Sequence, residues 1–167
     1  MKYFKMKEFE CRCGCTSAGS ARAMPAEVKA NIKALVDNVL DPLREAYGKP
    51  INVNSGFRCE KHNKEVGGVP NSQHVKGEAA DIRPGTLNAG GKPLIPASEP
   101  ESPANMEIPH QVRNEELMTL ARLIVAQCRF DQLILYPTFL HVSYKRNGAN
   151  RHKVLKKTSV GYAPVSI

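Results

Sequence analysis

Residues 52–84 read NVNSGFRCEKHNKEVGGVPNSQHVKGEAADIRP, and this stretch organises the interpretation of the whole chain. Residues 51–54 alternate apolar and polar side chains and predict a short strand that breaks at a Ser-Gly pair. Residues 59–66 predict a brief helix that a Gly-Gly pair ends. Residues 79–82 are apolar except for Asp81 and predict a second strand. The stretch therefore predicts two strands separated by a turn, a helix and a loop.

Two side chains in this stretch are able to bind the same metal ion only if the backbone between them reverses. His74 and Asp81 lie seven positions apart, which is roughly 10 Å along a continuous helix and over about 20 Å along a strand. Gly77 lies where the reversal is needed, because glycine adopts positive φ without steric cost. The small residues Ala79 and Ala80 allow close packing of the neighbouring backbone.

A third ligand is available far downstream in the apolar run TFLHVSY, residues 138–144. Strand alternation places His141 on the face opposite its two apolar neighbours. We therefore hypothesise one zinc ion held by His74, Asp81 and His141, with Arg58 at the mouth of the site. Ser143 lies on the same face as His141, and the sequence leaves open whether it orients the imidazole.

Simpler interpretations compete with a metal site. A histidine within an apolar strand is more often a packed core residue than a ligand, and Asp81 has a nearby cation in Arg83. The combination of His74, Asp81 and His141 with a glycine reversal is what favours the metal.

The rest of the chain predicts one α+β domain spanning residues 1–167. A first long helix begins after Pro25, and a second, with Asn114 as its N-cap, precedes a hairpin of residues 130–135 and 139–144. Residues 85–111 form a Pro-rich insertion, interpreted as a lid, a binding loop or disorder, and a basic tail ends the chain. The apolar positions of the first helix are Val28, Ile32, Leu35, Val36, Val39, Leu40 and Leu43.

The net charge of the chain indicates the class of partner. The net charge of +8 favours anionic partners such as nucleic acid, an anionic membrane surface or an acidic wall polymer. No nucleic-acid motif is present, so nucleic acid is not expected.

The tight spacing of Cys11, Cys13 and Cys15 within an odd total of five is unlike a disulfide framework. Because CxCxC lacks the two-residue gap of zinc knuckles, a structural or reduced-thiol role is favoured, with a second metal site as the alternative.

Three phrases carry a resemblance to a known family: SGFRCEKHN (55–63), SQHVKGEAADI (72–82) and FLHVSY (139–144). In this order they resemble the zinc D-Ala-D-Ala carboxypeptidase and L-alanyl-D-glutamate endopeptidase family, which cuts the peptide stems of peptidoglycan. The likeness covers roughly residues 4–145. It is greatest to small phage and prophage members, endolysin-like enzymes whose N-termini also contain a phrase like EFECRCGC.

The resemblance implies a fold and a set of roles. The fold is a small antiparallel sheet flanked by helices, with one Zn²⁺ per chain bound by the three ligands proposed above. Arg58 would be catalytic and would also bind the substrate carboxylate, and Ser72 and Gln73 would line the cleft. The activity would be a D,D-carboxypeptidase or an L,D-type endopeptidase, and the alternative is a non-catalytic wall-binding module of the same fold.

The general base is where the sequence departs from several family members. A glutamate often lies three residues before the last histidine, and Thr138 occupies that position here. Asp131, Glu78 and Tyr136 are the nearby alternatives, and Asp131 is the candidate catalytic residue. The choice among them stays open at the level of sequence.

The expected partner is a peptidoglycan peptide, with a contact between the basic tail and anionic wall polymer. No apolar run resembles a signal peptide or a membrane span. We therefore expect a protein that is cytoplasmic as synthesised and reaches the wall after lysis or release. We also expect it to be a monomer.

Overall fold

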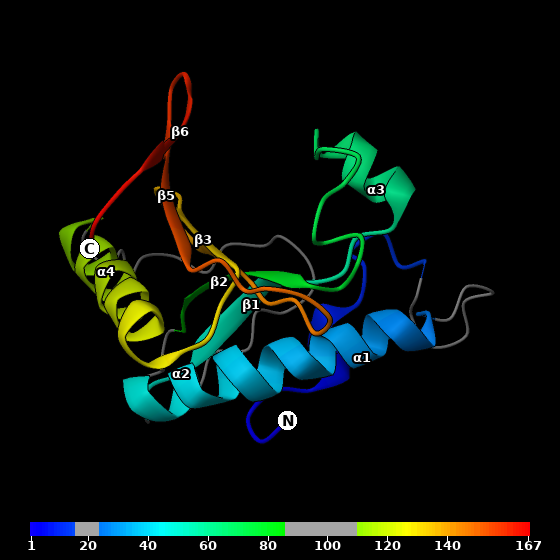
Figure 1. Cartoon of the computed structure of the whole chain (residues 1–167), viewed down its shortest axis with the longest axis horizontal. Coiled ribbons are helices and arrows are strands. Elements are labelled where there is room, and N and C mark those ends of the chain that lie inside the picture. Colours follow the sequence, from blue (N-terminus) through cyan, green and yellow to red (C-terminus); the bar gives the residue numbers. More distant parts are fainter. Residues whose placement is uncertain (16–23, 86–109) are drawn as a thin grey trace, which may run out of the picture.

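The computed structural model describes residues 1–15, 24–85 and 110–167. Six strands form one sheet in the order β1-β2-β4-β3-β5-β6, and every neighbouring pair is antiparallel except β3 and β5 (Figure 1). This arrangement confirms the predicted α+β fold. Most of the predicted Pro-rich insertion, residues 86–109, lies outside the described residues. The strands are β1 Ile51–Ser55, β2 Ala79–Pro84, β3 Gln132–Leu135, β4 Leu140–Ser143, β5 Lys153–Thr158 and β6 Gly161–Pro164.

The first predicted helix forms one long rod that supports the sheet. It consists of α1 (Ala26–Leu35), the π-helical turn η2 (Val36–Leu40) and α2 (Asp41–Tyr47). Proline at position 42 has no N–H to donate to the carbonyl four residues earlier, which accounts for the wider turn before it. The rod ends at Gly48, whose φ is +70°. All seven apolar residues predicted to form its inner face are buried.

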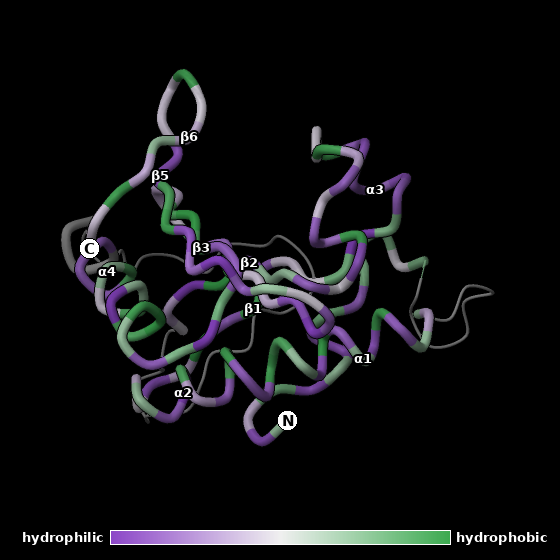
Figure 2. Tube along the Cα trace, in the orientation of Figure 1, coloured by the Kyte–Doolittle hydropathy of each residue, from purple (hydrophilic) through white to green (hydrophobic). Residues whose placement is uncertain are grey.

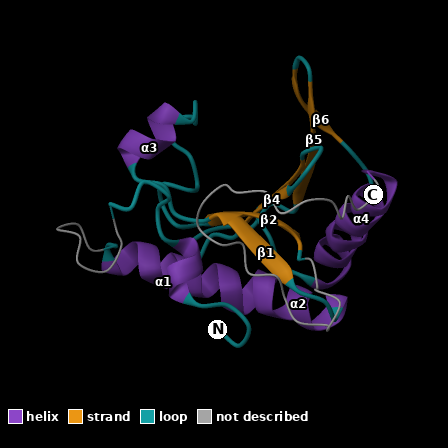
Figure 3. Cartoon of the chain, turned by 180° about the vertical axis from the view of Figure 1, so that it is seen from behind, coloured by secondary structure: helices purple, strands orange, loops and turns teal. Residues whose placement is uncertain are grey.

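The core lies between one face of the sheet and the helices α1, α2 and α4 (His110–Gln127) (Figure 3). Apolar positions recur along the rod among hydrophilic ones, whereas the short helix α3 (Glu60–Glu65) is hydrophilic along its length (Figure 2). Because α3 contributes few apolar side chains, it lies away from the rod at the end of the sheet. Its place in the chain matches the brief helix predicted for residues 59–66.

Strand alternation separates the core from the opposite face of the sheet. Ile82 on β2 and Leu140 on β4 are buried in the core cluster. Asp81 and His141, one position along on each strand, therefore face the other side, where they are direct partners in the β2–β4 ladder. The antiparallel register thus brings together two residues that lie sixty positions apart in the sequence.

One sequence prediction about the second half is wrong in detail. The helix α4 (His110–Gln127) begins four residues before Asn114, so Asn114 is an interior residue and not an N-cap. The basic tail, for which the sequence predicted no secondary structure, forms β5 and β6; Leu155 on β5 is buried, and β5 pairs with β3. No helix within the described ranges is long and apolar enough to cross a membrane.

Candidate metal centre

Three ligand atoms form a nearly equilateral triangle on the open face of the sheet. Nε2 of His74 lies 3.1 Å from Oδ1 of Asp81 and 3.1 Å from Nδ1 of His141. The remaining edge, from His141 Nδ1 to Asp81 Oδ1, is 3.0 Å. The structure therefore brings together the three residues that the sequence proposed as ligands.

The size of this triangle fits one tetrahedral ion. Ligand atoms about 2.0–2.1 Å from a tetrahedral metal are separated by about 3.3 Å from each other. The observed edges of 3.0 and 3.1 Å fall close to this value. Two imidazoles and one carboxylate leave a fourth position of the tetrahedron for water or substrate, which is the donor set of a catalytic site and not of a closed structural one.

Each imidazole is held in the form that binds a cation. Nδ1 of His74 lies 2.7 Å from the carbonyl oxygen of Gly56, and because a carbonyl only accepts, Nδ1 carries the hydrogen and Nε2 presents its lone pair to the triangle. Burial lowers the pKa of the His141 imidazole, which keeps that ring neutral. Ser143 does not orient His141, since its hydroxyl bonds to the backbone of Gln132.

The Asp81 carboxylate is kept ionised by its partners. Burial alone raises the pKa of Asp81, but the contacts of its carboxylate with the imidazoles of His141 and His74 outweigh burial and hold the pKa below its ordinary value. Its second oxygen forms an ion pair with Arg58, so the Arg83 pairing considered from the sequence is replaced by another cation. A buried carboxylate with three partners is negatively charged at neutral pH and available to a metal.

A tight turn connects His74 to the ligand strand. The N–H of Glu78 donates to the carbonyl of Gln73 at 2.9 Å, and Gly77 between them has a φ of +72°. This confirms the predicted reversal at Gly77. A Cβ at this position would also lie 2.8 Å from Val28 Cγ1, so the glycine is needed for close packing against α1 as well as for its backbone angle.

Gly77→Ala is expected to lower the free energy of unfolding by about 2 kcal/mol, from left-handed backbone strain of about 1 kcal/mol and overpacking of about 1 kcal/mol. Gly67→Ala is the matched control, because Gly67 has a φ of +71° but its Cβ would meet nothing within 4 Å. The free energy of unfolding of Gly67→Ala should fall by only about 1 kcal/mol. Urea unfolding of both variants measures the difference, and equal losses would show that the contact with α1 contributes nothing.

Arg58 connects the turn after β1 to the centre. Its Nε donates to Ser55 Oγ at 2.8 Å, and Nη2 pairs with Asp81, as described above. The side chain is only 18% exposed and lines the cleft beside the ligands. Arg58 therefore orients the carboxylate of Asp81. Its guanidinium also places positive charge at the edge of the site, the position that the sequence predicted for Arg58.

Asp131 is completely buried and forms an ion pair with the half-exposed side chain of Arg151. Nε of Arg151 donates to Oδ1 at 2.7 Å and Nη2 donates to Oδ2 at 2.6 Å, a bidentate fork. The amide of Gln73 donates to Oδ2 at 3.0 Å. Burial acts to raise the pKa of Asp131, but the hydrogen bonds from Arg151 prevail and lower it. These contacts give Asp131 an anchoring role for the metal-binding turn, and its role as a base stays a prediction.

The other candidate bases differ in position and chemistry. Glu78 lines the cleft, and burial raises the pKa of its carboxyl. Tyr136 also lines the cleft, stacks on Phe139 and bonds to the hydroxyl of Tyr162 at 3.0 Å. Burial raises the pKa of Tyr136, so it is a hydrogen-bond donor at neutral pH. Thr138, where family members often carry glutamate, is exposed in the turn between β3 and β4.

The ligands lie in a cleft of about 1240 Å³ whose charge is mainly positive. Two of the lining residues are acidic, Glu78 and Asp81, whereas six are basic. Ser72 and Gln73 both line it, but the Ser72 hydroxyl accepts from the His74 N–H at 3.3 Å and the Gln73 amide faces Asp131. The basic lining residues are Arg12, Arg58, Lys76, Arg83, Lys145 and Arg151.

Some functional groups in the cleft were not predicted from the sequence. Arg12 reaches the cleft from the N-terminal turn and donates to the Val53 carbonyl at 3.1 Å. The backbone carbonyl of Gly56, which orients His74, has no sequence signal because any residue supplies a carbonyl. Arg151 was grouped with the basic tail, and only the tertiary fold places it against Asp131.

Comparison with known proteins agrees with this geometry. The family model described as Peptidase M15 matches residues 2–91. The Zinc D-Ala-D-Ala carboxypeptidase of Streptomyces albus G is 43% identical over 77 residues, a match that covers 45% of this chain and 29% of that relative. The family match spans more than half of the chain and includes His74, Asp81 and Arg58. The chain belongs to the Peptidase M15 family.

Proposed function

We propose that the protein is a zinc-dependent peptidase that hydrolyses the stem peptides of peptidoglycan. The observation that carries the proposal is the ligand triangle of His74, Asp81 and His141, with edges of 3.0 and 3.1 Å, at the base of a basic cleft. Family membership and the name of the Streptomyces relative support zinc as the ion. The open fourth position distinguishes a catalytic from a structural ion.

The metal, when bound, would polarise the scissile carbonyl and lower the pKa of a water molecule toward neutrality. The residues of the chain perform the remaining tasks. The Gly56 carbonyl orients His74 by accepting from Nδ1, the ring nitrogen that does not face the metal position. Arg58 orients Asp81 by donating to Oδ2, the carboxylate oxygen outside the ligand triangle. Arg58 also lies where its guanidinium would stabilise negative charge that develops on the carbonyl oxygen. Tyr136 is protonated at neutral pH and offers a second donor in the same cleft.

The charge of the cleft supports an acidic peptide as substrate. Peptidoglycan stem peptides carry carboxylates at their termini and on side chains, and the six basic residues of the lining would attract them. Arg58 and Arg12 approach the cleft from different segments, so a substrate carboxylate has two guanidinium groups available. The basic C-terminal segment, which includes β5 and β6, contributes Arg151 and Tyr162 to the lining of the same cleft. This segment would contact anionic wall polymer.

Which bond is cut depends on how the peptide lies in the cleft. The name of the relative supports cleavage of a terminal D-Ala-D-Ala bond. The cleft volume of about 1240 Å³ exceeds the roughly 300–1,000 Å³ of small-ligand sites, which favours a longer peptide and keeps an L,D-type endopeptidase as the second candidate. Both activities use the same centre and differ only in the bond presented to it.

Incubation with defined muropeptides, followed by mass spectrometry of the fragments, tests the function and the bond together. Loss of one terminal alanine would establish the carboxypeptidase, and cleavage within the stem would establish the endopeptidase. Intact muropeptides that nevertheless co-sediment with the protein would instead establish the non-catalytic binding module. Zinc-loaded protein that neither cuts nor binds them would refute the proposal.

For the base, we propose Glu78 in preference to Asp131, because both oxygens of Asp131 are occupied by Arg151. Glu78→Gln is expected to reduce kcat about 100-fold, with zinc content and melting temperature unchanged. Since burial raises the pKa of Glu78, kcat/KM should decline on the acid side at a pH above the ordinary glutamate value of about 4.3. Asp131→Asn is the comparison variant. If it abolishes turnover while folded and Glu78→Gln does not, Asp131 is the base.

A further inference from the structure

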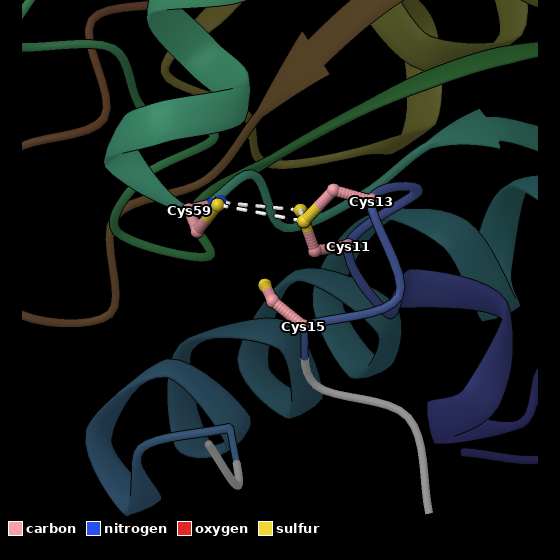
Figure 4. Close-up of side chains that lie close together, drawn as sticks. All are labelled: Cys11, Cys13, Cys15 and Cys59. Carbon is pink, nitrogen blue, oxygen red and sulfur yellow. Dashed lines mark hydrogen bonds between the residues drawn. The ribbon is translucent and has the colours of Figure 1, made fainter. Parts of the chain in front are cut away.

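A second cluster of ligand atoms lies outside the histidine and aspartate centre. The Sγ atoms of Cys11, Cys13, Cys15 and Cys59 all lie within 4.8 Å of one another. Figure 4 shows that three come from the N-terminal turn and the fourth from the beginning of α3. Cys13 Sγ lies 3.2 Å from Cys11 Sγ and 3.6 Å from Cys59 Sγ.

These separations suit one metal ion. Four thiolates about 2.3 Å from a tetrahedral zinc ion are about 3.8 Å apart. The separations of 3.2 and 3.6 Å lie close to this value, and all four sulfur atoms lie within 4.8 Å of one another. A cluster with several irons would hold its four sulfur atoms farther apart. We propose that Cys11, Cys13, Cys15 and Cys59 bind a structural zinc ion, separate from the ion of the catalytic centre.

The local backbone explains how a CxCxC sequence supplies three ligands to one ion. Residues 11–15 form a turn in which the N–H of Gly14 donates to the carbonyl of Cys11 at 3.0 Å. Gly14 has a φ of +72°, an angle that lets the chain curl and direct alternate side chains inward. In the sequence, CxCxC argued against a metal because it lacks the two-residue gap of zinc knuckles. The turn at Gly14 brings the cysteines together without that gap.

Backbone hydrogen bonds to sulfur support the same assignment. The N–H of Cys59 donates to Cys11 Sγ at 3.4 Å, and the N–H of His62 donates to Cys59 Sγ at 3.4 Å. Donors of this kind stabilise thiolates and fix the direction of a ligand sulfur. Two of the four sulfur atoms therefore have outer partners of the type that accompanies metal ligands.

The position of the cluster indicates what the ion would do. Cys59 directly follows Arg58, and the N–H of Phe57 donates to the carbonyl of Phe9 at 2.9 Å. The cysteine-bound ion would fasten the N-terminal turn to the loop that carries Arg58 and the Gly56 carbonyl. Four protein ligands leave no open position, so this ion is structural and takes no part in hydrolysis.

Metal analysis of the full-length His141→Ala variant tests the site in isolation, after purification with zinc under reducing conditions. The expected content is one zinc per chain, with thiolate as the nearest neighbour at about 2.3 Å by X-ray absorption. Cobalt exchanged into this variant should show cobalt–thiolate charge-transfer absorption in the near ultraviolet. A mercurial reagent should release the zinc as it modifies the four thiols.

The fifth cysteine provides the matched control. Cys128 is buried and bonds to the Val39 carbonyl at 3.6 Å, so Cys128→Ser in the His141→Ala background should retain its zinc. Cys13→Ser with Cys15→Ser in that background should lose it and melt at a lower temperature. If this variant fails to fold, release of zinc by the mercurial reagent still decides the question. A zinc-free His141→Ala protein, iron in place of zinc, or disulfides in its intact mass would overturn the proposal.

Discussion

Replacing His141 with alanine is expected to remove the catalytic ion and to reduce peptidase activity by at least about 10³-fold. His141 supplies one vertex of the ligand triangle, and its Nδ1 lies within 3.1 Å of the other two ligand atoms. Loss of oxyanion stabilisation alone costs about 10²–10³ in rate, and loss of the activated water is added to it. Zinc measured by mass spectrometry should fall by one equivalent per chain, in parallel with muropeptide cleavage.

His62 provides the matched control for this experiment. It is a histidine near the same cleft, but its Nδ1 lies 3.6 Å from Glu65 on α3, and it is not part of the triangle. His62→Ala should therefore keep the full zinc content. If His62→Ala lost as much zinc as His141→Ala, or if His141→Ala retained full activity, the triangle would not be the catalytic centre. Because the cysteine cluster excludes both histidines, its ion should remain in either variant.

Local pattern was sufficient to predict most elements that position the metal. Apolar periodicity located the long helix up to Gly48, and alternation located the strands that carry Asp81 and His141. Gly77 was predictable because two ligands seven residues apart require a reversal between them. These inferences succeeded because each depends on neighbouring residues.

The remaining features depend on contacts between distant segments. Asn114 looked like an N-cap, but α4 continues for four residues on its N-terminal side. Residues 153–158 looked like a charged tail because the apolar content is low, yet the free edge of β3 offers hydrogen bonds that order them as β5. Likewise, Cys59 joins the three N-terminal cysteines only through the fold, across 46 positions from Cys13. No local pattern encodes such encounters.

The pairing of Arg151 with Asp131 joins the segment that leads into β5 to the metal-binding turn. Asp131 is completely buried, whereas the Arg151 side chain is half exposed. Through its second oxygen, Asp131 accepts from the amide of Gln73, whose backbone carbonyl in turn accepts from Glu78. The ion pair therefore holds in place the turn that presents His74.

Arg151→Met is expected to lower the free energy of unfolding by about 3 kcal/mol at neutral pH. Removal of one partner from a buried ion pair costs about 3–5 kcal/mol, and the lower end applies because Arg151 is half exposed. For a chain of this length the melting temperature should fall by about 6–12 °C. Calorimetry at neutral pH measures the loss. Arg129→Met is the control, because Arg129 is exposed and it should change stability by less than about 0.5 kcal/mol.

The pH dependence of this loss distinguishes charge from packing. The pKa of Asp131 is lowered in the folded protein, so its ionised form stabilises the fold above the ordinary aspartate pKa of about 3.9, and this contribution is lost as the pH falls through the folded-state value. Without Arg151, burial is opposed only by weaker partners, the Gln73 amide and the Lys145 ammonium 3.6 Å from Oδ1, so the pKa of Asp131 should rise and protonation should relieve the poorly compensated charge. The destabilisation by Arg151→Met should therefore be largest near neutral pH and shrink toward pH 4.

A double variant completes this test. In Asp131→Asn with Arg151→Met the buried charge is absent, so the pair of substitutions should destabilise the protein less than Arg151→Met alone at neutral pH. Both proteins should then unfold with similar free energies in mild acid, where Asp131 is protonated. An equal loss for Arg151→Met at neutral and acidic pH would show that the methylene stem of the arginine, and not its charge, stabilises the turn beside His74.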